Sequence, residues 1–240
     1  MSEVHRLLGT PRFGGILVVS DHASNHVPPD IALGIEPALL TEHMAWDIGV
    51  AAVGAAMAQR PGTAAFQCGV SRLVCDVNRE PEAAGAVPVA SDGHDIPGNH
   101  LSSAERDKRL AQFHAPYHAA LDRLLGESPP ALILSLHSFT PALRTCDKPR
   151  PWQVGVLYNE DDRAARLAIP LFEAEGLCVG DQQPYSGREL NYTMNRHAEA
   201  EGRPYLGVEI RQDEIDHAAG QARWAERLAR IAGAVALQMA

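Results

Sequence analysis

Three side chains that can bind a metal or move a proton follow short apolar stretches of the chain. They are His22, His137 and Glu209, and they follow or end the runs 15–19, 131–134 and 205–208. Apolar runs of this length are typical of buried parallel strands. The carboxyl ends of such strands meet at one edge of an α/β sheet, where ligands bind. Two histidines and one glutamate at that edge could hold a divalent metal and activate a water molecule.

The two histidines have a simpler interpretation as well. His22 lies in a turn-rich segment before Pro28 and could merely hydrogen-bond a backbone carbonyl. His137 alone, at the end of a strand, is equally open to either interpretation. Together at one sheet edge they favour a shared metal site, because ligands occur in clusters. His26 precedes Val27, and we expect it to face solvent.

Asp47 is a candidate third ligand. It lies early in an alanine-rich helix predicted over residues 42–60, which Pro61 and Gly62 terminate. A carboxylate there either interacts with the positive N-terminal end of the helix or reaches the metal. The sequence leaves both interpretations open.

A carboxylate, an amide and a guanidinium occur together in Asp76, Asn78 and Arg79, at the end of a strand predicted over residues 70–77. Arg79 could bind a substrate carboxylate through two hydrogen bonds, with help from Arg72. The alternative is a structural ion pair between Asp76 and Arg79 that fixes the loop.

Glu209 lies within an apolar strand, where an unpaired carboxylate is costly. Arg211 is two residues further on and therefore on the same face of the strand. A salt bridge between the two is one interpretation. We favour the other, in which Glu209 is a general base close to the metal.

Two further groups of polar residues have different expected roles. His114 and His118 are four residues apart on a predicted helix, and the absence of a glutamate of the H-E-x-x-H type favours a structural role. The segment 180–203 lacks periodicity and is predicted to cross the top of the sheet. It is rich in groups that bind carboxylates or stabilise an oxyanion, namely Arg188, Asn195, Arg196 and His197.

Strands that alternate with helices predict one α/β domain over residues 1–240, with three layers and a mainly parallel or mixed sheet covered by helices on both faces. Residues 80–98 are predicted to form a long loop. Ser102 and Glu105 resemble a capping box, and Pro116 should kink or divide the helix that follows. The remaining predicted elements are a strand over 152–158, a helix over 161–175 and a closing helix over 215–239.

Composition narrows the class of function. The 240 residues carry a net charge of −9, which argues against nucleic acid as the main partner but not against a small anionic substrate. No apolar stretch is long enough to span a bilayer, and residues 1–12 lack the apolar core of a signal peptide. The four cysteines form no C-x-x-C pair. We therefore expect a cytoplasmic protein with reduced thiols.

Taken together, these motifs resemble the N-formylglutamate amidohydrolase family over about residues 14–216. The resemblance rests on the blocks 20–28, 46–49, 71–79, 136–141 and 209–213. That family is similar in fold to the zinc carboxypeptidases and aspartoacylase, also called the zinc-exopeptidase or phosphorylase/hydrolase-like fold.

The resemblance implies specific roles for individual residues. His22 and His137 would be zinc ligands, Asn78 and Arg79 a substrate clamp, and Glu209 the catalytic glutamate. The wider zinc-peptidase pattern is His-x-x-Glu, whereas Asn25 stands at the fourth position here. An amide is a poor zinc ligand. Asp47 is therefore the first choice for the third ligand, followed by Asn25 and Asp21.

The implied activity is hydrolysis of a small N-acyl amino acid, with zinc or another divalent metal as cofactor. The leading substrate is N-formyl-L-glutamate, which yields formate and L-glutamate in histidine degradation. Arg196 or His197 would stabilise the oxyanion, and Arg188 would assist in substrate binding. The alternatives are a zinc exopeptidase or deacylase that acts on another N-blocked substrate, and a non-catalytic carboxylate-binding protein.

Overall fold

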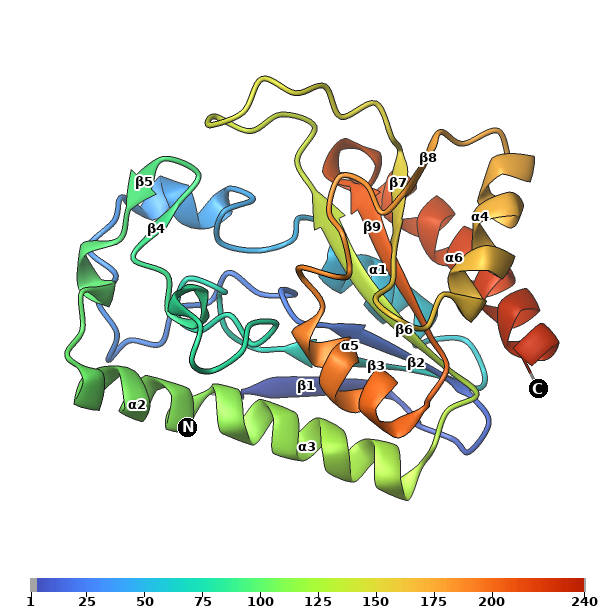
Figure 1. Ribbon diagram of the computed structural model, residues 1–240, viewed down its shortest axis with the longest axis horizontal. Helices are drawn as coiled ribbons and strands as arrows, with labels where there is room; N and C mark the ends of the chain where they lie inside the picture. The colour runs from blue at the N-terminus through green and yellow to red at the C-terminus, as the bar shows by residue number, and fades with distance from the viewer. Residues whose placement is uncertain (1–3, 240) are drawn as a thin grey trace.

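A seven-stranded mixed sheet forms the centre of the molecule in the computed structural model, which describes residues 4–239 (Figure 1). The strand order is β1-β3-β2-β6-β9-β7-β8. The bounds are β1 (His5–Gly9), β2 (Ile16–Ser20), β3 (Thr63–Cys68), β6 (Leu132–Phe139), β7 (Val154–Leu157), β8 (Val179–Asp181) and β9 (Tyr205–Arg211). Strands β3, β2, β6 and β9 are parallel, whereas β1 and β7 run antiparallel to their neighbours β3 and β9. The predicted α/β class with a mixed sheet is confirmed.

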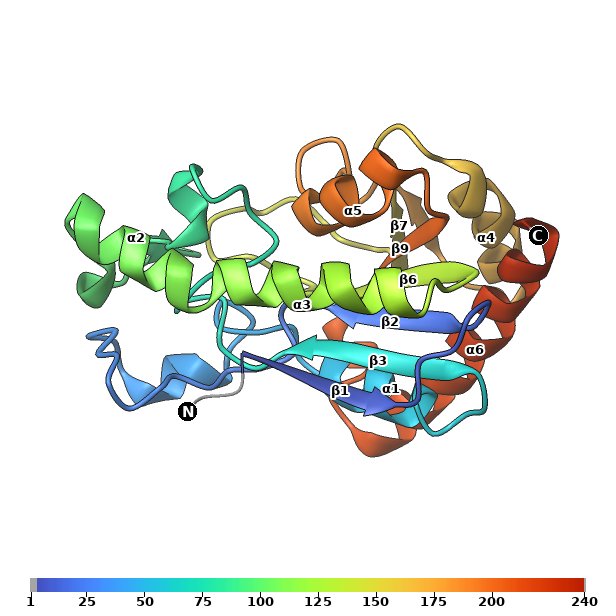
Figure 2. The ribbon, with the colours of Figure 1, turned by 90° about the horizontal axis from the view of Figure 1, so that it is seen from below.

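Helices cover both faces of this sheet. Figure 2 shows α3 (His114–Glu127) along one face, with α5 (Tyr192–His197) nearby, and α1 (Val50–Met57) and α6 (Ala218–Met239) on the opposite side. α4 (Arg163–Ala174) packs against α6. The core strands are buried on both faces; all eight residues of β6, for example, are buried. This two-sided burial explains why their sequences are continuous apolar runs rather than alternating ones.

The segment 70–77, predicted to be a strand, is instead a series of turns, and the strand precedes it as β3. The backbone N–H groups of Val74 and Cys75 both donate to the Ser71 carbonyl, and the Ser71 hydroxyl donates to the Ala45 carbonyl. These local hydrogen bonds satisfy the backbone without a partner strand. The apolar side chains of the segment are still buried, which is the property that the sequence pattern detected.

The helix predicted over 42–60 is shorter than expected, because α1 begins only at Val50. The preceding residue, Gly49, has a left-handed conformation with φ of +84°. A Cβ atom added there would lie 2.1 Å from the Ile215 carbonyl oxygen, so only glycine fits. Asp47 consequently lies in a turn before the helix, with its side chain directed toward the edge of the sheet.

The helix predicted after Ser102 is divided into two, as expected, but the division lies at Phe113 and not at Pro116. α2 (Ser103–Gln112) begins with the predicted capping box of Ser102 and Glu105, and Phe113 separates it from α3. Pro116 occupies the first turn of α3, where a backbone N–H needs no partner within the helix.

The other predicted elements are present with small shifts at their ends. β7, α4 and α6 correspond to the strand over 152–158, the helix over 161–175 and the closing helix over 215–239. Residues 80–98 form mainly loop, with a short hairpin of β4 (Ala90–Ser91) and β5 (His94–Asp95) and two 3-10 turns. Among the described residues, the helices are too short or too polar to cross a membrane.

Candidate functional site

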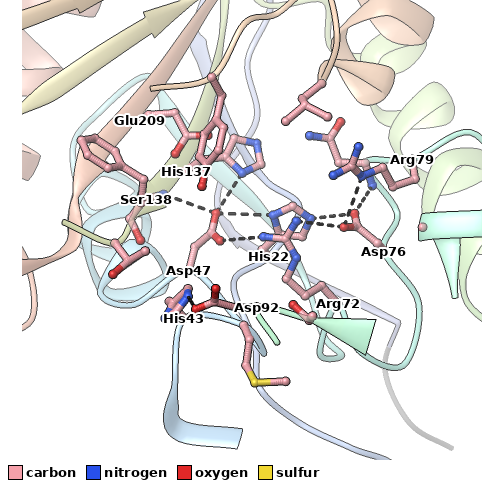
Figure 3. Close-up of a pocket in the computed structure, with 18 of the residues that line it drawn as sticks. His22, His43, Asp47, Arg72, Asp76, Arg79, Asp92, His137, Ser138 and Glu209 are labelled. Carbon is pink, nitrogen blue, oxygen red and sulfur yellow. Dashed lines mark hydrogen bonds and ion pairs between the residues drawn. The ribbon is translucent and has the colours of Figure 1, made fainter. Parts of the chain in front are cut away.

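A cleft of about 350 Å³ opens at the carboxyl ends of β2, β6 and β9. The parallel register sets His137 on β6 directly beside Glu209 on β9. His22 enters from the loop after β2, and Asp47 from the turn before α1. Figure 3 shows these four side chains directed into the same space. The sequence prediction that strand ends would bring the two histidines and the glutamate together agrees with this geometry.

Three of the side chains could hold a metal. His22, Asp47 and His137 are buried, and each offers a ligand atom within 4.8 Å of the other two. Asp47 Oδ2 lies 2.9 Å from Nδ1 of His137 and 3.4 Å from Nδ1 of His22. Asp47 therefore lies beside both histidines, as a shared metal site would require.

Each histidine has a second carboxylate behind it. Nε2 of His22 donates to Asp76 at 2.7 Å, and Nε2 of His137 lies 3.5 Å from Asp21. Tyr117 donates to the other oxygen of Asp21 at 2.7 Å. A carboxylate on the outer nitrogen of a histidine fixes the ring and strengthens its inner nitrogen as a metal ligand.

The buried carboxylates create a strong preference for positive charge in this cluster. Burial alone would raise the pKa of Asp47, but His22 and His137 lower it well below its usual value. Burial likewise opposes ionisation of Asp76, and His22 and Arg72 overcome it and lower that pKa. Because a divalent cation supplies the same positive charge, these residues suit a metal ion. Two nitrogens and one carboxylate oxygen are donors that zinc accepts.

Glu209 is buried at the inner wall of the cleft. Among the described residues, its Oε2 atom has no hydrogen-bond partner. Burial raises the pKa of Glu209 to about 7, although His137 opposes that shift. The salt bridge to Arg211 that the sequence allowed is absent, because Arg211 pairs with Asp213 at 2.7 Å. An unpaired carboxylate with this environment can accept and release a proton near neutral pH.

Cationic and amide groups line the opposite wall. Arg79 reaches the cleft, with its Nε atom 3.8 Å from Asp76. The carbonyl oxygen of the Asn78 side chain accepts from the Thr193 backbone N–H at 2.9 Å, so the amide NH₂ is the end left to bind a ligand. Arg72 donates to Asp76 at 2.9 Å and lies 3.4 Å from Asp47.

Three residues proposed from the segment 180–203 lie away from the cleft. Arg188 is exposed, and Arg196 contacts Asp122 and the Tyr192 hydroxyl at the surface. His197 is fully buried on α5 and interacts with Asp122. The segment does pass over the sheet, but only Tyr185, Leu190 and Asn191 from it line the cleft. This placement is a correction to the expected oxyanion and substrate contacts, because α5 directs Arg196 and His197 toward Asp122 of α3, and Arg188 lies in the exposed loop before α5.

The alternative third ligands are also occupied elsewhere. Asn25 donates its amide to the Leu40 carbonyl, and Asp21 supports His137. The contact of Asp76 with His22 was not predicted, because no spacing rule links residues 54 positions apart. The role of Ser138, whose backbone N–H donates to Asp47 at 3.3 Å, was not predicted either. The buried segment 70–77, misassigned as a strand, was the signal that could have placed Asp76 deep in the site.

Comparisons with known proteins agree with this description. A model of the N-formylglutamate amidohydrolase family matches residues 14–215. A solved gene product from Agrobacterium tumefaciens is 31% identical, with a TM-score of 0.92 over 98% of this chain and 95% of that one. N-formylglutamate amidohydrolase from Ralstonia eutropha JMP134 is 18% identical, with a TM-score of 0.76 over 98% of each chain, which supports the fold. No curated protein sequence matches the chain.

Proposed function

The chain belongs to the N-formylglutamate amidohydrolase family, whose members are hydrolases that act on amide bonds, and we propose that it cleaves small N-acyl amino acids with a divalent metal. The leading substrate is N-formyl-L-glutamate, with formate and L-glutamate as products. One observation carries the proposal: His22, Asp47 and His137 converge beside an unpaired carboxylate, Glu209, within one cleft.

Zinc is the first candidate for the metal, held by His22, Asp47 and His137. A divalent metal in such a site polarises a carbonyl and makes water more acidic. Asp76 and Asp21 would keep the two imidazole rings oriented toward it.

Glu209 would serve as the general base. It takes a proton from the attacking water and returns it to the nitrogen of the leaving amine. The role needs a carboxylate that is buried, close to the metal ligands and free of a competing partner. Glu209 has these properties, because it is the strand neighbour of His137 and its Oε2 has no partner among the described residues.

Arg79 and Asn78 would bind the carboxylate of the substrate. The guanidinium of Arg79 contacts Asp76 only at 3.8 Å, which leaves its hydrogen-bonding edge for a ligand. Arg72 is better located than Arg196 to stabilise the oxyanion, because it lines the cleft and lies beside Asp47. The leaving amino acid would therefore lie toward Arg79 and the acyl group toward Glu209.

We further propose that the enzyme acts in the cytoplasm. All four cysteines are free thiols, as expected for a protein of a reducing compartment.

A substrate panel tests the proposed function. Protein purified without chelators and supplied with zinc should hydrolyse N-formyl-L-glutamate faster than N-acetyl amino acids or dipeptides, and a chelator should stop the reaction. Asp47→Asn should greatly weaken both metal binding and activity, while Asp107→Asn, at an exposed site on α2, should change neither. Preference for a dipeptide or an N-acetyl compound would instead indicate an exopeptidase or another deacylase. Binding of carboxylates without stoichiometric metal or turnover would contradict the enzyme proposal.

A further inference from the structure

The segment that carries Asn78 and Arg79 is held from behind by two histidines of α3. His118 Nε2 lies 2.9 Å from the Val77 carbonyl oxygen, and His114 Nε2 lies 2.9 Å from the Arg79 carbonyl oxygen. A carbonyl oxygen can only accept, so both ring nitrogens must donate. The two carbonyls flank Asn78, and the histidines are one helical turn apart, which matches the spacing of the carbonyls.

We propose that His114 and His118 are positioning residues that orient Asn78 and Arg79 for the substrate carboxylate. The inference rests on the proposed function, because it assigns Asn78 and Arg79 to carboxylate binding. Neither histidine lines the cleft. They act through the backbone: a rotated Val77 or Arg79 peptide would turn the adjacent side chains away from the ligand.

A chain of hydrogen bonds fixes the tautomer of His118. Its Nε2 donates to Val77, so the Nδ1 atom of a neutral ring must accept. Nδ1 lies 2.8 Å from Nε2 of His197, which therefore donates. The other nitrogen of His197, Nδ1, lies 2.7 Å from a carboxylate oxygen of Asp122.

The number of protons in this series of hydrogen bonds locates the third proton. Three contacts join the Val77 carbonyl, His118, His197 and Asp122, and each needs one proton. Two neutral imidazole rings carry only two. The third proton therefore lies between His197 Nδ1 and Asp122, at the half-exposed end of the chain.

The surroundings support a neutral His118 at the inner end. Burial lowers the pKa of His118 to about 3, with His114 and His197 contributing and Asp21 opposing. Burial also lowers the pKa of His197, whereas Asp122 opposes that shift. The other groups that face the two rings are Tyr117, Tyr192 and Arg196.

Besides the hydrogen bonds of His114 and His118, a third contact with the segment that carries Asn78 comes from α5. The Thr193 backbone N–H donates to the Asn78 side chain, so α3 holds the backbone on both sides of Asn78 while α5 holds its amide. The chain through His197 also links α5 to His118. Both helices thus hold the same three-residue segment.

Paired substitutions test the positioning role. Glutamine places its amide nitrogen near the position of a histidine Nε2 and can still donate to the carbonyl, whereas asparagine reaches only the Nδ1 position. His114→Asn and His118→Asn should each raise KM for substrates with a free carboxylate roughly tenfold, the scale of one lost hydrogen bond to a buried acceptor, with kcat within about twofold. His114→Gln and His118→Gln should remain close to wild type.

Two controls make the test specific. Substrates with an amidated carboxylate should show no such difference between the Asn and Gln variants, and Arg123→Gln, at an exposed position of α3, should change nothing. Equal losses of kcat/KM on free and amidated substrates would overturn the positioning role in favour of a general effect on folding. An unchanged KM in both Asn variants would overturn it as well.

A measurement on the wild-type protein separates this inference from the proposed function. Long-range ¹⁵N–¹H NMR of the imidazole rings should show His118 protonated only at Nε2, and His197 with a proton on Nε2. A His118 ring protonated at Nδ1 would overturn the inference even if the enzyme is active. Failure of every substrate in the panel would contradict the proposed function and leave this result intact.

Discussion

At the scale of single residues, the candidate metal site depends on carboxylates that are far in the sequence from the histidines they contact. Asp76 is 54 residues from His22 and yet binds its outer nitrogen at 2.7 Å. It also accepts from Arg72 and from the backbone N–H of Asn78. One carboxylate thereby connects the metal-ligand cluster to the residues proposed to bind substrate.

Asp76→Asn tests this connection. Asparagine keeps the size of the side chain but loses the charge that orients His22 and balances Arg72. We expect metal affinity to fall by about 10–100-fold, the usual effect of losing such a carboxylate. Competition with a chromogenic chelator measures the affinity, with Asp107→Asn as the surface control. Unchanged affinity would mean that Asp76 serves only to anchor Arg72.

Glu209→Gln tests the general base. The amide is nearly isosteric, so the strand should pack as before and the metal should remain bound. We expect turnover to fall by at least about 10²-fold, the scale of general-base catalysis, with little change in KM. Steady-state kinetics and metal analysis of the same preparation check this. Turnover near that of the wild type would return Glu209 to a purely structural role.

At the scale of elements, a capping box begins α2, and a break at Phe113 separates α2 from α3, the helix that carries His114 and His118. Ser102 accepts from the Glu105 backbone N–H, and Glu105 accepts in return from the Ser102 backbone N–H. Ser102→Ala should lower the free energy of unfolding by about 1 kcal/mol, whereas Ser103→Ala, one residue further into the helix, should have little effect. Urea unfolding of both variants measures the difference. Equal stability of the two variants would show that the cap adds nothing at this exposed helix end.

Short apolar runs predicted β2, β6 and β9 because those strands are buried on both faces, and their ends located His22, His137 and Glu209. The same logic failed for 70–77, since burial alone does not distinguish a strand from a compact turn closed by Ser71. β3 and the two edge strands, β1 and β8, were missed. β1 is partly exposed and has little apolar character, so its sequence carries no clear signal.

The positions of Arg188, Arg196 and His197 could not be predicted for a different reason. The segment 180–203 was correctly expected to lie above the sheet. The side-chain directions of Arg196 and His197 depend on a six-residue helix, α5, that has no clear periodicity in the sequence, and Arg188 lies in the loop before it. Long-range contacts such as His118 with His197 decide those directions. Such pairs, 79 residues apart, leave no local pattern.

At the scale of the whole molecule, the buried histidines couple stability to pH. Burial lowers the pKa of His118 in the folded state to about 3, below the ordinary histidine value of about 6.5. As the pH falls, His118 therefore takes up a proton in the unfolded chain before it does so in the folded protein. Its contribution to the free energy of unfolding is complete above about pH 6.5 and is lost as the pH falls toward 3. The slope within that window is up to about 1.4 kcal/mol per pH unit.

Comparison with His118→Gln isolates this effect from the other titrating groups. Between pH 7 and pH 5, the wild type should lose about 2 kcal/mol more unfolding free energy than the variant, because glutamine does not titrate. Urea denaturation at both pH values gives the two differences. Parallel losses in both proteins would show that His118 is already protonated in the folded state or remains accessible to water.

The close contact between Gly49 and the Ile215 carbonyl has a genetic consequence. No other residue fits at position 49, and the contact joins the turn after Asp47 to the chain just before α6. A library of random substitutions selected for activity should therefore recover only glycine there, as strictly as it recovers the metal ligands. Such a screen would mark Gly49 as essential although it does not line the cleft, because any side chain there would separate the turn after Asp47 from the segment before α6.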